Sequence, residues 1–218
     1  MVGATVPAAV VGGINGALAG HRRVHRWRSI RGVTAFVLDS TWALPSTAVA
    51  LVAHAVAALQ REPGNYLVEL SEGCDRHVYA RGLTVRRGFL LTTGNVVNGA
   101  GRHALRVARQ RRVVTVHEHA HVWQARWLGP LYPVAYLGWS ALGAVAGTVR
   151  WMAGSREQPF GRSIEAWAYY ANPFEWWAYS REERWPPPGA LAPHTWRRPF
   201  PGHRLRIPTV GTESIEIG

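Results

Sequence analysis

The stretch VVTVHEHAHVWQARWLG, residues 113–129, carries the strongest signal for fold and function in this chain. Valines flank the pattern H-E-x-x-H, formed by His117, Glu118 and His121, and this favours a buried helix that ends at Gly129. Residues four apart lie on the same face of a helix, so both imidazoles can reach one metal ion. Glu118 lies beside them and can act as general base on a water bound to that ion. Two imidazoles and a carboxylate favour Zn2+.

Two other polar residues lie within the same helix. His119 is out of phase with His117 and His121, so we expect it to face away from the metal, behind the ligands or at the surface. Gln124 lies about one turn beyond His121, on nearly the same face. It could form a hydrogen bond near the metal, although a packing role is favoured.

The third metal ligand must come from a later segment of the chain. Glu165 and Glu175 each begin the pattern E-x-x-A, whose small alanine allows close packing against the histidine helix. Asn172-Pro173 is a helix-start signal that places Glu175 in a first turn, so Glu175 is favoured and Glu165 is the alternative. We expect the other carboxylate to hold an imidazole N–H or to be structural. The candidates after His121 are Glu157, Glu165, Glu175, Glu182 and Glu183.

The segment HEHAHVWQ followed by NPFEWWAY resembles the zincin metallopeptidases of the gluzincin type. It is most similar to small bacterial proteins, some membrane-associated, that carry H-E-x-x-H-x-x-Q and a later N-P-[LF]-E-x-x-A. The resemblance covers about residues 113–180 and implies zinc held by His117, His121 and Glu175, with Glu118 as catalytic base. It implies hydrolysis of a peptide or protein substrate that it does not name. Candidates for stabilising the transition state are Tyr169 and Tyr170, on proximity alone.

Composition restricts the classes of partner. The chain has 218 residues, of which 47% are hydrophobic, and its single cysteine excludes an internal disulfide and a cysteine-based zinc cluster. The net charge is +12, and all 25 basic residues are arginines spread over many segments. Because no recognition helix gathers them, we expect no nucleic-acid partner. Eleven tryptophans suit a membrane interface, and they suit a packed core or a hydrophobic cleft equally.

Three apolar stretches favour association with a membrane. Residues 1–20 carry no charge, residues 21–31 form a basic cluster, and residues 33–59 are again apolar, although Asp39 and Pro45 interrupt them, as in a helical membrane hairpin. A buried helix of a soluble domain explains residues 33–59 nearly as well. We expect a bacterial inner-membrane location and leave the sidedness open.

The third stretch, residues 127–149, contains no charged residue but cannot be a simple span. A span would place Glu175 about 30 Å from the histidines, since that is the thickness of the hydrocarbon layer. Prolines and glycines interrupt the stretch, which favours a re-entrant, interfacial or buried helical hairpin.

The sequence predicts a mainly helical α+β fold in three regions. These are a hydrophobic helical region over residues 1–60, a zincin-like metal-binding domain over residues 61–183, and an extended or disordered Pro/Arg-rich tail over residues 184–218. In the second region we expect the histidine helix to pack against a helix that carries the glutamate ligand. Short β-prone runs at 66–70, 76–80 and 89–93 predict a small antiparallel hairpin or meander.

Together these features favour a membrane-associated zinc metallopeptidase. The alternative is a non-catalytic, metal-stabilised membrane or scaffold protein. The oligomeric state is left open.

Overall fold

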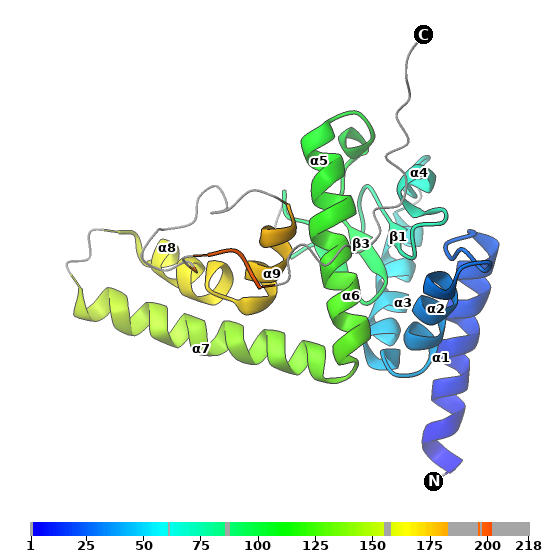
Figure 1. The fold of residues 1–218 in the computed structure, drawn as a ribbon, viewed down its shortest axis with the longest axis horizontal. Helices are drawn as coiled ribbons and strands as arrows, with labels where there is room; N and C mark the ends of the chain where they lie inside the picture. The colour runs from blue at the N-terminus through cyan, green and yellow to red at the C-terminus, as the bar shows by residue number, and fades with distance from the viewer. Residues whose placement is uncertain are drawn as a thin grey trace.

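The computed structural model describes residues 2–60, 62–85, 88–154, 158–182, 196 and 198–201. As predicted, the fold is mainly helical with one small sheet. Helices α1–α3 lie together at one end of the molecule, α7–α9 lie at the other end, and α6 lies between the two groups (Figure 1). The elements are α1 (Val2–His21), α2 (Ile30–Ser40), α3 (Leu44–Leu59), α4 (Val68–Ser71), β1 (His77–Val78), β2 (Leu91–Thr93), β3 (Val96–Asn98), η1 (Arg102–Leu105), α5 (Ala108–Arg112), η2 (Val113–Glu118), α6 (His119–Leu128), α7 (Leu131–Ala153), α8 (Phe160–Glu165), η3 (Ala166–Tyr170) and α9 (Pro173–Arg181).

Of the three N-terminal helices, α3 packs against the sheet through small side chains, and α1 and α2 pack on α3 and on each other. Ser29 caps α2 by accepting a hydrogen bond from the backbone N–H of Gly32. Ala50, Ala53 and Ala57 of α3 are buried in one cluster with Val96 of β3 and with Tyr79, which follows β1. Among the described helices, none alone has the length and apolarity to cross a bilayer, whereas α2 and α3 meet that test as a pair bent by 88°.

The sheet is mixed, with strand order β1-β3-β2. Strands β1 and β2 fall within the predicted runs 76–80 and 89–93, whereas no strand was predicted at β3. β2 and β3 form an antiparallel hairpin, but β1 pairs with β3 in parallel, so a wholly antiparallel meander was wrong. Strand β3 can run beside β1 in the same direction because residues 79–95, which include β2, carry the chain back to the end of the sheet where β1 begins. The predicted strand over residues 66–70 was also wrong, because only Tyr66 forms a bridge, to Tyr79, before α4 begins. Leu67 and Leu70, three residues apart, are both buried, which suits a helical turn.

The uncharged stretch 127–149 does not form a hairpin by itself. After the break at Gly129 and Pro130 it continues as one uninterrupted helix, α7. Pro133 lies in the first turn of α7, where the helix needs no N–H from it. The predicted break at Pro130 is present, but the later proline and glycines do not interrupt α7, and the chain reverses only after residue 153. The predicted hairpin within the stretch was therefore wrong.

Two glycines of α7 allow very close packing against the returning segment. A methyl group at Gly143 would lie 2.5 Å from the carbonyl oxygen of Trp167 in η3, and one at Gly147 would lie 2.8 Å from that of Ser163 in α8. Both contacts are far shorter than van der Waals separation, so only glycine fits here. Backbone packs against backbone along this side of α7.

The predicted tail over residues 184–218 lies outside the described residues, apart from 196 and 198–201. These few residues pack on α9. Trp196 stacks on Trp176 with ring centroids 4.3 Å apart, and the Trp176 indole N–H donates a hydrogen bond to the carbonyl of Arg198. The backbone N–H of Phe200 donates to the hydroxyl of Ser180.

Candidate metal centre

Three predicted ligands converge at one point. The Nε2 atoms of His117 and His121 lie 3.2 Å apart. One carboxylate oxygen of Glu175 lies 3.2 Å from Nε2 of His117, and the other lies 3.3 Å from Nε2 of His121. All three side chains are buried, and a single metal ion could contact all of them. The group joins two segments of the chain, the η2–α6 helix and the first turn of α9.

Local sequence explains how each segment presents its ligands. Residues 113–118 are π-helical and run directly into α6, a local departure from α-helical geometry that is frequent at functional sites. His117 and His121 nevertheless remain about one turn apart, with ring centroids separated by 4.9 Å. At the second segment, the Asn172 side chain accepts a hydrogen bond from the N–H of Phe174, and Pro173 begins α9. This is the predicted helix start, and it sets Glu175 against the histidines.

Glu165 is not brought to the histidines. It lies at the end of α8, where its carboxylate is 3.6 Å from the guanidinium of Arg162. Glu182, after the end of α9, instead holds the imidazole, because its carboxylate lies 2.6 Å from Nδ1 of His117. A carboxylate at this nitrogen leaves Nε2 to face the ion and makes the imidazole a stronger ligand.

His121 is oriented by an amide. Its Nδ1–H donates to Oε1 of Gln124 over 2.8 Å, and the Gln124 amide donates in turn to the carbonyl of Phe174 over 3.0 Å. Gln124 is completely buried. The residue therefore does more than pack: it sets the tautomer of His121 and ties α6 to the start of α9.

Tyrosines of α7 and α9 form the wall of the site. The hydroxyl of Tyr136 donates to Oε1 of Glu175 over 2.7 Å, and the hydroxyl of Tyr132 lies 3.3 Å from Nδ1 of His121. Tyr179 packs edge-on against His117, with ring centroids 4.5 Å apart. Sequence reasoning missed these three, although the one-turn spacing of Tyr132 and Tyr136 just after the motif was a usable signal.

The tyrosines singled out from the sequence lie farther out. The hydroxyl of Tyr169 is 3.1 Å from that of Tyr179, so Tyr169 adjoins the site through a second tyrosine. Tyr170 packs against Tyr169, with ring centroids 5.1 Å apart.

The charges of the buried ligands are mutually stabilising. Burial lowers the pKa of His117, but hydrogen bonding with Glu175 and Glu182 outweighs this and raises it to about 10. Burial raises the pKa of Glu175, but the charge on His121 and hydrogen bonds from both imidazoles lower it well below its usual range. Without metal, protons on the imidazoles thus compensate the carboxylate, and a bound cation would take their place.

The proposed base, Glu118, is held by the sheet. Its Oε2 accepts a hydrogen bond of 2.6 Å from the hydroxyl of Thr92 in β2. Glu118 is buried beside the histidines in the chain. The hairpin of β2 and β3 therefore positions a carboxylate that the helix alone would leave free to rotate.

His119 faces away from the metal, as predicted, and enters a buried polar network. Its Nε2 lies 2.6 Å from Nη2 of Arg31, and its Nδ1 lies 2.8 Å from Nη1 of Arg76. Burial and then the neighbouring arginines lower the pKa of His119 well below its ordinary value.

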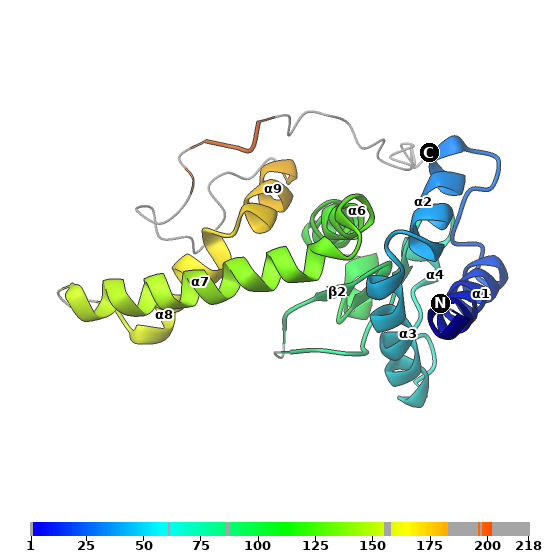
Figure 2. The ribbon, with the colours of Figure 1, turned by 90° about the horizontal axis from the view of Figure 1, so that it is seen from below.

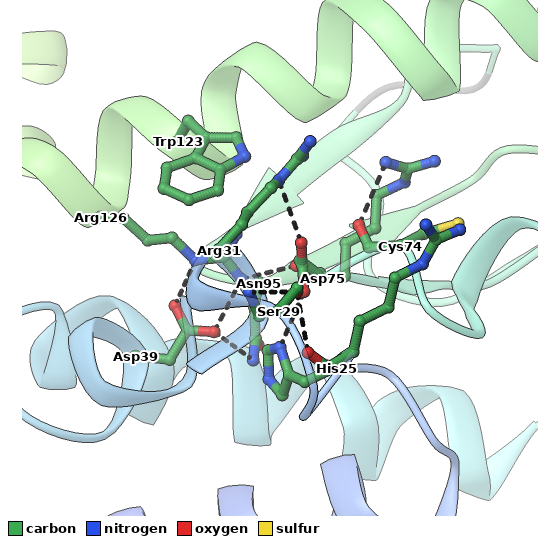
Figure 3. Close-up of polar contacts among 12 residues, drawn as sticks. His25, Ser29, Arg31, Asp39, Cys74, Asp75, Asn95, Trp123 and Arg126 are labelled. Atoms are coloured by element: carbon green, nitrogen blue, oxygen red, sulfur yellow. Dashed lines mark hydrogen bonds and ion pairs between the residues drawn. The ribbon is translucent and has the colours of Figure 1, made fainter. Parts of the chain in front are cut away.

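The same network joins α2 to α6 (Figure 3). Arg126 donates two hydrogen bonds of 2.8 Å to the carboxylate of Asp39. Arg31 and His25 each lie 3.2 Å from an oxygen of Asp75. These contacts anchor the helix that carries His117 and His121 on the N-terminal helices.

The chain matches no family model, no curated protein and no solved structure in comparisons with each.

Replacement of Glu182 tests the role of the outer carboxylate. We expect Glu182→Gln to weaken zinc binding by about 10–100-fold, the usual effect of losing a hydrogen-bond partner of a metal-bound imidazole. Competition with a zinc-specific chelator measures the change. Glu165→Gln removes the same charge from the same half of the chain and should leave the affinity unchanged; a larger effect at Glu165 would contradict the assignment.

Proposed function

We propose that this protein is a zinc-dependent hydrolase of peptide bonds. The observation that carries the proposal is the spacing of the three donor atoms, 3.2, 3.2 and 3.3 Å. Ligand atoms at about 2.0–2.1 Å from a tetrahedral zinc ion are about 3.3 Å apart. Three protein ligands leave one tetrahedral position for water or substrate, as in catalytic zinc sites.

The donor set fits zinc better than other common ions. Two neutral imidazoles and one carboxylate are typical zinc ligands, whereas calcium and magnesium prefer sites made of oxygen. Gln124 and Glu182 supply the hydrogen-bond partners that orient zinc-bound imidazoles. The set therefore supports zinc through the chemistry of each ligand as well as through its geometry.

Each residue has a distinct task in the proposed reaction. Bound zinc would polarise the scissile carbonyl and lower the pKa of the attacking water. Glu118 would accept a proton from the attacking water and would deliver it to the leaving amine. Thr92 holds the Glu118 carboxylate through its hydroxyl, and Tyr136 holds Glu175.

Metal removal tests the proposal directly. We expect the purified protein to contain one zinc per chain by elemental analysis and to hydrolyse an unstructured peptide, and we expect chelation to stop hydrolysis until zinc is restored. His121→Ala should abolish stoichiometric zinc, because it removes one of three ligands. His103→Ala, at an exposed histidine, is the control. Zinc retained in full by His121→Ala would refute the site.

A non-catalytic, metal-stabilised scaffold is the second candidate. The burial of all three ligands favours it, since structural metals are typically enclosed by protein. Zinc that is bound stoichiometrically and raises the melting temperature, without any hydrolysis that depends on Glu118, would select this function.

A further inference from the structure

Helix α7 has two unlike faces. Its inner face carries Tyr132 and Tyr136, which contact the metal ligands, and Gly143 and Gly147, which pack against η3 and α8. Its outer face carries large aliphatic residues in a helical stripe, each between 59% and 71% exposed: Leu131, Val134, Leu142, Val145, Val149 and Met152.

No described segment covers the outer face. Figure 1 shows α8 and α9 on one side of α7 only, and Figure 2, seen from below, shows α7 uncovered along its whole length. A contiguous apolar stripe of this kind marks an interaction surface, because water-exposed helices normally place polar residues there. The outer face of α7 carries apolar residues where polar ones are usual, and this indicates an apolar partner.

The flanking residues identify the chemistry of that partner. No Asp or Glu occurs between Glu118 and Glu157, whereas Arg150 is exposed in the last turn of α7. Trp127, in the last turn of α6, is partly exposed just before the stripe, and Trp139 is partly exposed within its length. Aliphatic residues bordered by tryptophan and arginine are typical of helices that lie in the headgroup region of an anionic bilayer. A second copy of the chain would instead bring together two surfaces of a protein whose net charge is +12.

The geometry favours a helix lying on the membrane rather than crossing it. The inner face of α7 is occupied by protein along its length, through Tyr136, Gly143 and Gly147. A crossing would also carry Glu175 away from the histidines, with which it is in contact. Of the two faces of α7, the outer stripe is the one that no described segment covers.

We propose that the outer face of α7 docks on an anionic lipid bilayer and that the metal site acts on polypeptide segments at the membrane surface. The second clause rests on the proposed function. The hydroxyl of Tyr136 reaches Glu175 from the inner face of the same helix. A helix with its side chains is about 10–12 Å across, so the site lies about one helix diameter above the lipid.

Vesicle flotation of the full chain tests the docking face. Wild type is expected to float with vesicles that contain phosphatidylglycerol and much less with pure phosphatidylcholine. The double variant Leu142→Glu, Val145→Glu should have at least about tenfold lower affinity for the anionic vesicles. Burial of a single Leu or Val side chain already changes an affinity by about tenfold. The matched control is Val85→Glu, Val107→Glu, which adds the same charge at exposed valines outside α7.

Equal flotation of the α7 variant and wild type would overturn the proposal. So would a wild-type dimer in gel filtration that the α7 variant converts to a monomer while neither binds vesicles, because the face would then belong to a second copy. Zinc content, measured on every variant, should stay at one per chain, which shows that the site is folded.

The substrate clause has its own measurement. A peptide tethered to anionic vesicles should be cleaved faster than the same peptide free in solution, and the α7 variant should lose this preference while cleaving the free peptide normally. Equal rates on both forms with wild type would overturn the substrate clause. Vesicle binding without any hydrolysis would refute the proposed function and support the docking face.

Discussion

Glu118→Gln is expected to reduce peptide hydrolysis by about 10²–10⁴-fold, the range typical for loss of a general base. The amide keeps the size of the side chain and can still accept from the hydroxyl of Thr92, but it cannot take up a proton from water. Zinc content should stay at one per chain, because Glu118 is not among the three convergent ligands. The measurement combines elemental analysis with initial rates on an unstructured peptide.

The control for this substitution is Glu69→Gln, at an exposed glutamate of α4. It removes the same charge and should leave the rate unchanged. A Glu118→Gln protein that hydrolyses peptide at the wild-type rate would exclude Glu118 as the base. Loss of zinc together with activity would instead assign Glu118 to the structure of the site.

Asp39→Ala is expected to lower the free energy of unfolding by about 3–5 kcal/mol, the usual cost of leaving one partner of a buried ion pair alone. Asp39 accepts two hydrogen bonds from Arg126 and one from the amide of Asn95, and both charged side chains are almost completely buried. The alanine variant removes the carboxylate that pairs directly with the buried guanidinium of Arg126. Urea unfolding of the zinc-loaded protein measures the difference.

An exposed ion pair provides the comparison. Glu62 lies 2.7 Å from Arg81, with side chains 41% and 66% exposed. Glu62→Ala should change the free energy of unfolding by only about 0–1 kcal/mol, since water screens the pair. Equal losses in the two variants would show that the Asp39–Arg126 contact contributes no more than a surface pair.

The parts of the site that were predictable from sequence depend on local geometry. A one-turn spacing places His117 and His121 together whatever surrounds them. Asn172 and Pro173 encode the start of α9. The side chain of Asn172 accepts a hydrogen bond from a backbone N–H of the first turn, and Pro173 has no N–H that needs a partner. The choice of Glu175 followed from that local signal, and the structure sets it beside the histidines.

The parts that were not predictable depend on segments that meet only in the folded chain. Glu182 reaches His117, and Thr92 reaches Glu118, from elements whose placement the sequence pattern does not reveal. Asp39 interrupted an apolar stretch without any indication that Arg126 was its partner. Pairing in parallel between β1 and β3 likewise depends on the route of a long connection.

Because of the backbone contacts at Gly143 and Gly147, substitutions at these two positions would disturb the site although neither residue carries a functional group. Any side chain at Gly143 would push α7 away from η3, because the obstacle is a carbonyl oxygen and not a flexible side chain. Tyr136 lies on the same face, about two turns earlier, and its hydroxyl would be drawn away from Glu175. In a survey of tolerated substitutions, these two glycines would therefore rank with the ligands, although neither could be recognised from its chemistry.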